Sequence, residues 1–127
     1  EAALQWEASA AQARGWDPAA CEKQRHGARH VTIALPALPA AGRAVVLLDD
    51  VASSGQTLVE ATRLLRAADA SSVDVAVTHA LFAGDAIDRV QAAGARQVWS
   101  TDCIPHPSNA VSIVPAVAGV LAQWASD

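Results

Sequence analysis

The stretch AVVLLDDVASSGQT, residues 44–57, decides the fold, because it reads as a buried strand that leads through a polar loop into a helix. Residues 44–48 form a continuous apolar run, which is typical of a parallel strand buried on both faces. Asp49 and Asp50 follow directly, and a loop of small polar residues comes after them. Because neighbouring carboxylates repel each other, we expect a positively charged or hydroxyl-bearing group beside this pair.

Strand and helix patterns alternate along the rest of the chain. The predicted strands are residues 44–48, 72–80, 97–101 and 110–114, and the predicted helices are residues 2–14, 57–68, 85–93 and the segment from Pro115 onward. The last helix carries one apolar face, made of Val117, Val120, Leu121 and Trp124. This alternation predicts an α/β fold, with an open, mainly parallel sheet and helices on both sides.

Local residue types predict where the helices begin and end. Gly15 is expected to close the first helix in the left-handed conformation. Thr57 and Glu60 have the spacing of a capping box at the start of the second helix. Asp85 is the expected N-cap of the third helix, and Gly94 is expected to end it.

A basic segment precedes the acidic pair. Its basic residues are Lys23, Arg25, His26, Arg29 and His30, which surround Gly27. The alternation in residues 30–33 predicts a strand, so we expect a small β-hairpin or mobile flap here. Taken by charge alone, the segment is more typical of a solvated basic hairpin than of a catalytic element. The Pro- and Gly-containing residues 36–42 then form a short connector.

The composition indicates a single globular domain of 127 residues. Hydrophobic residues make up 52% and charged residues 17%, which excludes the disordered class. A net charge of −4, with nine Lys and Arg in no dense run, argues against nucleic acid as a partner. The apolar stretches are too short to cross a membrane and no signal peptide is visible, so we expect a cytoplasmic protein.

Cysteine and methionine usage adds two expectations. Cys21 and Cys103 lie in no zinc-binding spacing, and no residue of this chain is predicted as a direct metal ligand. We expect reduced thiols, and a single disulfide is the alternative. The sequence contains no Met, so we expect a fragment or a processed chain.

The loop after the acidic pair has the features of a phosphate site. In open α/β sheets, ligands bind beyond the carboxyl ends of the strands. The loop leads into a helix N-terminus, whose free N–H groups and dipole suit an anion. Gly55 permits close approach of the backbone, while Ser53, Ser54 and Thr57 add hydroxyl donors. With two carboxylates to accept bonds from hydroxyls or hold a cation through water, a phosphorylated sugar is the predicted ligand. The alternative is a capped helix beside two solvated carboxylates.

Several motifs resemble one enzyme family. VVLLDDVASSGQT resembles the phosphoribosyl-binding motif of the type I phosphoribosyltransferase fold. TLVEATRLLRAA, VAVTHALFAGDAIDRV and STDCIPHP are together similar to the C-terminal lobe of ribose-phosphate pyrophosphokinase, also called phosphoribosyl diphosphate synthetase. EKQRHGARHVTI resembles the flexible catalytic loop of that family, with its Lys-x-Arg pattern. The resemblance runs from about Trp6 to Leu121.

The resemblance implies a two-lobe enzyme, in which residues 1–127 are one phosphoribosyltransferase-like domain, the C-terminal lobe. Such an enzyme uses Mg²⁺ to move a diphosphoryl group from ATP to the 1-hydroxyl of ribose 5-phosphate, and AMP leaves. The implied substrate-binding residues are Asp49 and Asp50 for the ribose hydroxyls and Ser53, Ser54, Gly55, Gln56 and Thr57 for the 5-phosphate, and the implied catalytic residues are Lys23 and Arg25. A homo-oligomer is also implied. The adenine-binding groups would lie outside this chain, so we expect the chain alone to be inactive.

Two residues depart from the family's motif. An Asp commonly stands at the position of Ser53, and a small Gly at that of Gln56, so Gln56 places a side chain inside the predicted cradle. These departures keep a non-catalytic, synthase-like regulatory subunit open as an alternative. A phosphoribosyltransferase that consumes phosphoribosyl diphosphate is a second alternative, because the acidic motif fits it equally well. His79 and His106 are expected to be structural residues, and His26 is expected to contact a nucleotide.

Overall fold

The computed structural model describes residues 8–26, 30–37 and 39–125. Residues 8–12 are helical. The elements that follow are β1 (Glu22–His26), β2 (His30–Ala34), β3 (Ala44–Ala52), α2 (Gln56–Ala67), β4 (Ser72–Ala80), α3 (Ala86–Ala92), β5 (Ala95–Thr101), β6 (Asn109–Val111) and α4 (Val114–Trp124). Strand and helix therefore alternate from β3 to β5, as the sequence pattern predicts.

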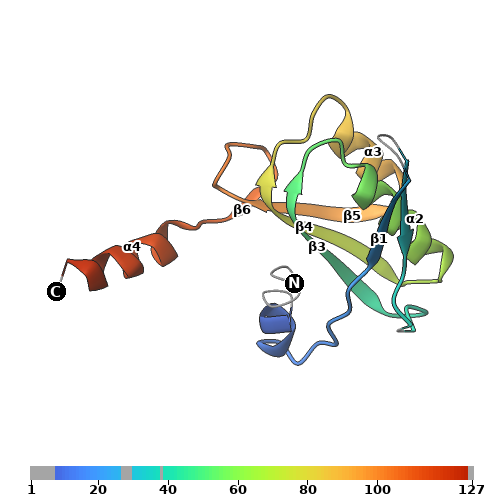
Figure 1. Ribbon diagram of the computed structural model, residues 1–127, viewed down its shortest axis with the longest axis horizontal. Coiled ribbons are helices and arrows are strands. Elements are labelled where there is room, and N and C mark those ends of the chain that lie inside the picture. Colours follow the sequence, from blue (N-terminus) through green and yellow to red (C-terminus); the bar gives the residue numbers. More distant parts are fainter. Residues whose placement is uncertain (1–7, 27–29, 38, 126–127) are drawn as a thin grey trace.

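The strands form two separate sheets (Figure 1). A four-stranded parallel sheet has the order β3-β4-β5-β6, and β1 pairs with β2 in an antiparallel hairpin. The helices α2 and α3 connect β3 to β4 and β4 to β5, which is how parallel neighbours are normally joined. The predicted fold class is confirmed: an α/β fold with a mainly parallel sheet flanked by helices, plus a small hairpin.

The strand β3 lies at the edge of the described sheet, so the prediction that it is buried on both faces is wrong. Its residues from Val45 to Asp49 are half-buried, whereas Val73 and Val75 of β4 are completely buried. The difference follows from strand order, because β4 has a strand on each side and β3 has only one among the described strands. The strand also continues to Ala52, so the acidic pair lies within it and not beyond its end.

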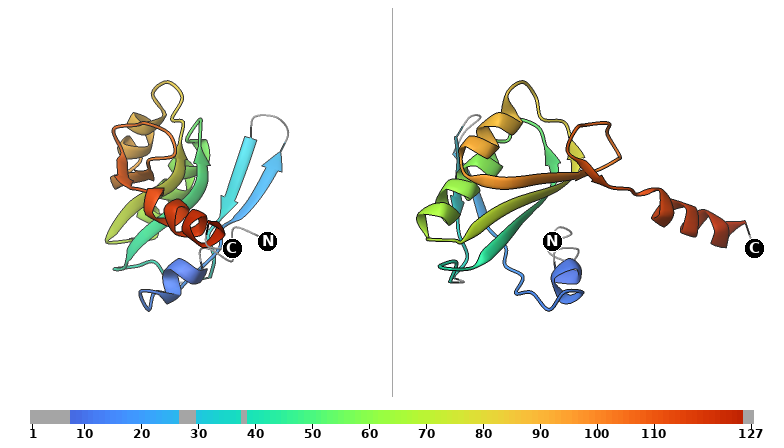
Figure 2. Two further views of the ribbon diagram at one scale, coloured as in Figure 1. Left: turned by 90° about the vertical axis from the view of Figure 1, so that its left-hand side faces the viewer. Right: turned by 180° about the vertical axis from the view of Figure 1, so that it is seen from behind.

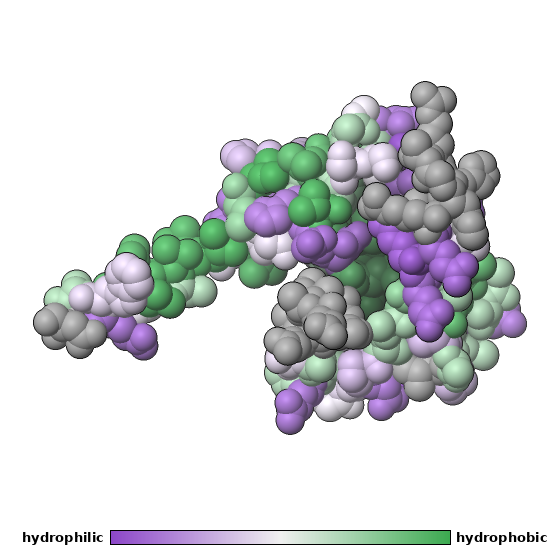
Figure 3. Space-filling view, viewed as in Figure 1, coloured by the Kyte–Doolittle hydropathy of each residue, from purple (hydrophilic) through white to green (hydrophobic). Residues whose placement is uncertain are grey.

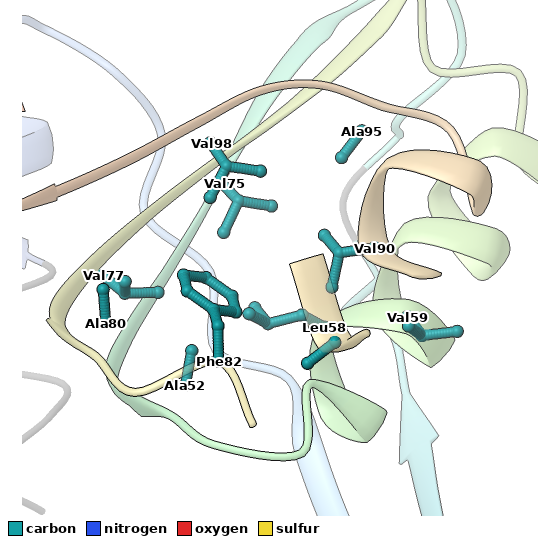
Figure 4. Packing of buried hydrophobic residues seen from close by; sticks show 11 residues of the cluster. Ala52, Leu58, Val59, Val75, Val77, Ala80, Phe82, Val90, Ala95 and Val98 are labelled. Atoms are coloured by element: carbon teal, nitrogen blue, oxygen red, sulfur yellow. The ribbon is translucent and has the colours of Figure 1, made fainter. Parts of the chain in front are cut away.

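The core lies between the sheet and the two helices α2 and α3. Val75 and Val77 of β4 point toward the helices, two residues apart as the strand repeat requires. They pack with Leu58 of α2, Val90 of α3 and Phe82 of the loop between β4 and α3 (Figure 4). Burial of such side chains stabilises a fold by roughly 1.5–3 kcal/mol each. This packing fixes the start of α2, and with it the loop that leaves β3.

The helix α4 extends away from the sheet (Figures 1 and 2). Helices were predicted on both sides of the sheet; α2 and α3 pack together on one face, and α4 has no buried residue against either face. The apolar face of α4 is exposed, with Leu121 at 58% and Trp124 at 78% (Figure 3). The last strand ends early, at Val111, and α4 begins at Val114, so the helix starts at the end of the sheet and runs outward.

The helix ends agree with the sequence at α3 and differ at α2. Gly15 and Gly94 adopt positive φ angles of 65° and 114°, as expected at the ends of their helices. The prediction of a capping box at Thr57 is wrong, because the N-cap of α2 is Gly55 and no side chain caps this helix. Asp85 is the N-cap residue of α3, but it makes no side-chain cap hydrogen bond.

Candidate functional site

The acidic pair is tied to its own backbone near the end of β3. Asp49 Oδ1 accepts a hydrogen bond from the Asp50 N–H at 2.9 Å, and Asp50 Oδ1 accepts one from the Val51 N–H at 2.8 Å. Burial raises the pKa of the Asp49 carboxyl above its ordinary value of 3.8, and the neighbouring Asp50 carboxylate adds to this rise. The Lys23 ammonium acts in the opposite direction. The site therefore concentrates negative charge that a cation or hydroxyl donors would relieve.

The loop from Ser53 to Thr57 is shaped by Gly55. This residue is buried and has a φ angle of 71°, a conformation that costs residues with a side chain about 1–2 kcal/mol. The first turn of α2 has no side-chain cap, and Ser54 Oγ accepts only a long bond of 3.4 Å from the Gln56 N–H. A helix N-terminus of this kind binds anions through its backbone N–H groups. Gln56 is the first residue of α2, and it is exposed.

The segment after β4 holds this loop from behind. The N–H groups of Leu81 and Phe82 both donate to the Ala52 carbonyl, at 3.1 and 2.8 Å. The Ala83 N–H donates to the Ser53 carbonyl at 2.9 Å. These bonds join two segments that lie about thirty residues apart in sequence, so the loop is fastened to the sheet before any ligand arrives.

The hairpin brings Lys23 to the same place. Lys23 lies in β1 opposite Ile33 of β2, and Ile33 is 5% exposed. The strand β2 contacts α2, so this buried side of the hairpin is the one that anchors it. Arg25 pairs with Val31 in the backbone ladder, but its side chain lies outside the described part of the chain, as do the side chain of His26 and the whole of Arg29. Their predicted roles stay predictions.

A single polar pocket of about 260 Å³ collects most of the predicted site residues. Its lining consists of Lys23 and residues 49–58. The structure thus brings Lys23, both aspartates and the complete loop together, although Lys23 lies more than twenty residues from the others in sequence. The pocket combines a cation, two carboxylates and a helix N-terminus. These groups complement the phosphate acceptors and the hydroxyl donors of a sugar phosphate. What each residue binds stays a prediction.

The two histidines have neighbours that suit a structural role. His106 Nδ1 lies 2.7 Å from Ser108 Oγ and accepts a bond from the Ser108 N–H at 3.1 Å, and its ring lies 5.2 Å from that of Phe82. His79 is half-buried in β4, opposite Val51 of β3. Neither histidine lines the pocket of the acidic pair. These contacts support the interpretation of both as structural residues.

Sequence reasoning missed Arg89. Its guanidinium donates through Nη2 to the Ser54 carbonyl at 2.7 Å and through Nε to Asp85 Oδ1 at 3.0 Å. The spacing of Asp85 and Arg89 is i, i+4, which signals an ion pair on a helix. Nothing in the sequence signals the bond to Ser54, because the two residues are 35 positions apart.

The structure also bears on metals, disulfides and membranes. Among the described residues, no three His, Cys, Asp or Glu side chains come together as a metal cage. No disulfide joins Cys21 and Cys103 in the structure. Within the described ranges, no helix has both the length and the apolar content needed to span a membrane.

Comparisons with known proteins agree with this geometry. The phosphoribosyl transferase domain family matches residues 22–115. The ribose-phosphate pyrophosphokinase of Methanopyrus kandleri is 41% identical over 97 residues, which are 76% of this chain and 33% of that protein. The one from Pyrococcus furiosus is 36% identical over 100 residues, which are 79% of this chain and 36% of that protein.

A solved structure extends the similarity to the fold. The crystal structure of phosphoribosylpyrophosphate synthetase from Mycobacterium smegmatis matches with a TM-score of 0.74 and 26% sequence identity. The match covers 97% of this chain and 42% of that one. The chain thus spans about a third of the length of the curated relatives it matches. It belongs to the phosphoribosyl transferase domain family, and within that family it is similar to the ribose-phosphate pyrophosphokinases.

Proposed function

We propose that this chain is the C-terminal lobe of a ribose-phosphate pyrophosphokinase, with residues 1–127 as a single domain. The reaction is transfer of the diphosphoryl group of ATP to the 1-hydroxyl of ribose 5-phosphate, which gives phosphoribosyl diphosphate and AMP. The observation that carries the proposal is the pocket in which Lys23 faces the acidic pair and the loop of residues 53–57. The names of the relatives support the same reaction.

In this proposal the pocket binds ribose 5-phosphate at two points. The 5-phosphate lies at the start of α2, where the N–H groups around Gly55 and the hydroxyls of Ser53, Ser54 and Thr57 donate to it. Asp49 and Asp50 accept hydrogen bonds from the ribose hydroxyls. The half-buried position of Asp49 favours such bonds, because hydroxyl donors stabilise a carboxylate that burial destabilises.

The hairpin supplies the cations of the transfer step. The 1-hydroxyl oxygen attacks the β-phosphorus of ATP, its proton is lost, and the bond from that phosphorus to the oxygen shared with the α-phosphate breaks. Negative charge then spreads over the phosphoryl oxygens and the leaving AMP. Lys23 and Arg25 stabilise that charge when the hairpin closes over it, and closure also excludes water.

The two carboxylates fit a magnesium ion that takes most of its ligands from elsewhere. Mg²⁺ is commonly held by one or two carboxylates together with water and substrate phosphates, and Asp49 and Asp50 offer that many in this chain. When bound, the ion would offset charge on the phosphates. Burial raises the pKa of the Asp49 carboxyl, and a cation bound beside it would favour the ionised form.

The remaining parts of the enzyme are proposed to lie outside this chain. The relatives are about three times as long as the matched region, so the groups that bind adenine are assigned to the rest of the protein. We also propose that the whole protein is cytoplasmic and forms a homo-oligomer. The chain alone is expected to form no AMP.

The test is formation of AMP from ATP and ribose 5-phosphate in the presence of Mg²⁺. The full-length protein that carries this chain should turn over, and residues 1–127 alone should not. Robust turnover by residues 1–127 would contradict the division of the site between two lobes. No turnover by the full-length protein would contradict the proposed reaction.

The exposed side chain of Gln56 at the pocket favours a second candidate, a non-catalytic regulatory subunit. A long polar side chain there competes with the phosphate for space at the helix N-terminus. Gln56→Gly in the full-length protein separates the two. If the protein is the enzyme, the substitution should change its affinity for ribose 5-phosphate by no more than a few-fold. If it is the non-catalytic regulatory subunit, it should bind ribose 5-phosphate only after the substitution.

A further inference from the structure

The bond between Arg89 and Ser54 crosses from α3 to the back of the loop. Arg89 is the fourth residue of α3, and its Nη2 lies 2.7 Å from the Ser54 carbonyl oxygen. Its Nε lies 3.0 Å from Asp85 Oδ1, so Asp85 holds the same guanidinium from the N-cap position of α3. The guanidinium therefore has two fixed points, and one of them is the main chain of the predicted phosphate loop.

The planarity of the peptide bond gives this contact a consequence for the ligand. The Ser54 carbonyl and the Gly55 N–H belong to the same peptide unit, and in a trans peptide they point in opposite directions. A donor that holds the carbonyl toward α3 thereby turns the Gly55 N–H away from α3. The pocket is lined by Lys23 and residues 49–58 and by no residue of α3, so this N–H is turned away from a helix that lies outside the pocket.

The packing of Gly55 supports the same orientation. A Cβ atom at Gly55 would lie 3.3 Å from Val90 Cγ2 and 3.4 Å from Ala86 Cβ, so α3 is in close contact with the back of the loop. The Ala83 N–H fixes the preceding carbonyl, that of Ser53, at 2.9 Å. Two successive carbonyls of the loop are thus held by donors from one segment, residues 83–89, none of which lines the pocket.

We propose that Arg89 is a positioning residue for the phosphate loop, with Asp85 as its support. Arg89 turns the Gly55 N–H toward the bound phosphate and keeps the loop in its binding shape before the ligand arrives. The Arg89–Asp85 ion pair is exposed, so the pair itself contributes little to stability. The charge-assisted bond to the Ser54 carbonyl is the contact that matters. The proposal rests on the proposed function, because it assumes that the loop binds ribose 5-phosphate.

The experiment measures binding of ribose 5-phosphate to the full-length protein by calorimetry, and KM and kcat by AMP formation. Arg89→Met keeps the apolar stem and removes both donors, and we expect about 10-fold weaker binding and a similar rise in KM for ribose 5-phosphate. The KM for ATP and kcat should change less than twofold. Arg89→Lys keeps one donor and should restore most of the affinity. Asp85→Asn should weaken binding by less than threefold.

Arg66→Met is the matched control. Arg66 Nη1 donates to the Ala70 carbonyl at 2.7 Å, so it makes the same kind of bond at the far end of α2. This variant should lose stability without losing affinity for ribose 5-phosphate. Equal losses in Arg89→Met and Arg66→Met would overturn the proposal, and so would unchanged binding in Arg89→Met. If Arg89→Met does not fold, Arg89→Lys becomes the test. Its affinity for ribose 5-phosphate should then lie between that of wild type and that of Asp49→Ala, and an affinity outside this interval would overturn the proposal. A wild-type protein that binds no ribose 5-phosphate would instead contradict the proposed function.

Discussion

The two sides of the candidate site are held in different ways. The loop of residues 53–57 receives hydrogen bonds from Ala83 and Arg89 and lies against α3. The hairpin β1–β2 is a separate two-stranded sheet that contacts α2 through β2. The strand β1, which carries Lys23, has exposed side chains from Glu22 to Gln24. The loop is thus fastened to the body of the domain by hydrogen bonds and by the buried Gly55, whereas the hairpin contacts α2 along one strand, β2.

We expect ground-state binding to depend mainly on the loop and turnover mainly on the hairpin. A loop fixed before the ligand arrives loses little conformational entropy on binding, so it suits ground-state affinity for the sugar phosphate. A hairpin attached along one strand can move, so it suits groups that act only in the transition state. Variants on the loop should therefore change affinity, and variants on the hairpin should change turnover.

The largest effect is expected from Lys23→Ala. Loss of a fixed cation at developing phosphoryl charge should lower kcat by about 10²- to 10³-fold, with little change in binding of ribose 5-phosphate. Steady-state kinetics and calorimetry on the full-length protein measure the two quantities. Arg43→Ala is the control, because Arg43 is another exposed cation, paired with Asp17 outside the pocket. If Lys23→Ala loses affinity for ribose 5-phosphate but keeps its kcat, the proposal that the hairpin serves turnover and the loop serves binding is contradicted.

Gly55→Ala should reduce both stability and affinity. The positive φ angle of 71° costs a residue with a Cβ about 1–2 kcal/mol, and the methyl group also crowds Val90. Urea unfolding measures the first effect and calorimetry the second. Gly42→Ala shares the positive φ, at 70°, but its Cβ meets nothing within 4 Å. If the two variants lose the same stability and both keep full affinity, the loop is less tightly fixed than its contacts indicate.

A smaller effect is expected from Asp50→Ala. Loss of one acceptor for the ribose hydroxyls should weaken binding of ribose 5-phosphate about tenfold. Binding of inorganic phosphate, which has no hydroxyls of this kind, should change much less. Equal losses for both ligands would mean that Asp50 acts on the loop and not on the sugar.

The smallest effect concerns the pH dependence of stability. Burial raises the pKa of Asp49, so the folded state holds this proton more tightly than the unfolded chain does. The free energy of unfolding should therefore fall as pH rises from the ordinary Asp value of 3.8 through the raised one. Asp49→Asn removes this titration, so its stability should decline less over that interval. Chemical unfolding of both proteins between pH 4 and 7 measures the difference, and parallel curves would contradict the shift.

Local residue types predicted much of the fold, and most of the residues that they single out line one pocket. The apolar run before the acidic pair, the small polar loop and the basic hairpin each carry their signal within a dozen residues. The order of the strands is not a local property, so the edge position of β3 was not predicted. The sequence pattern predicts the helix α4 and its apolar face, but not that the helix extends outward from the sheet.

The contacts that fix the loop of residues 53–57 could not be predicted from the sequence. The N-cap of α2 was assigned to Thr57 because its side chain suits that role, whereas Gly55 occupies it through backbone conformation alone. The bond from Arg89 to the Ser54 carbonyl depends on how α3 packs against the loop. A backbone carbonyl is present in every residue, so no residue type signals such a partner.

The most direct test of the account is a calorimetric titration of the full-length protein with ribose 5-phosphate, and in parallel with ribose, in the presence of Mg²⁺. We predict saturable binding of ribose 5-phosphate, about tenfold weaker in Asp50→Ala. Ribose should show no measurable binding, since the loop at the start of α2 recognises the phosphate. Equal affinity for both sugars, or no binding of ribose 5-phosphate, would contradict it.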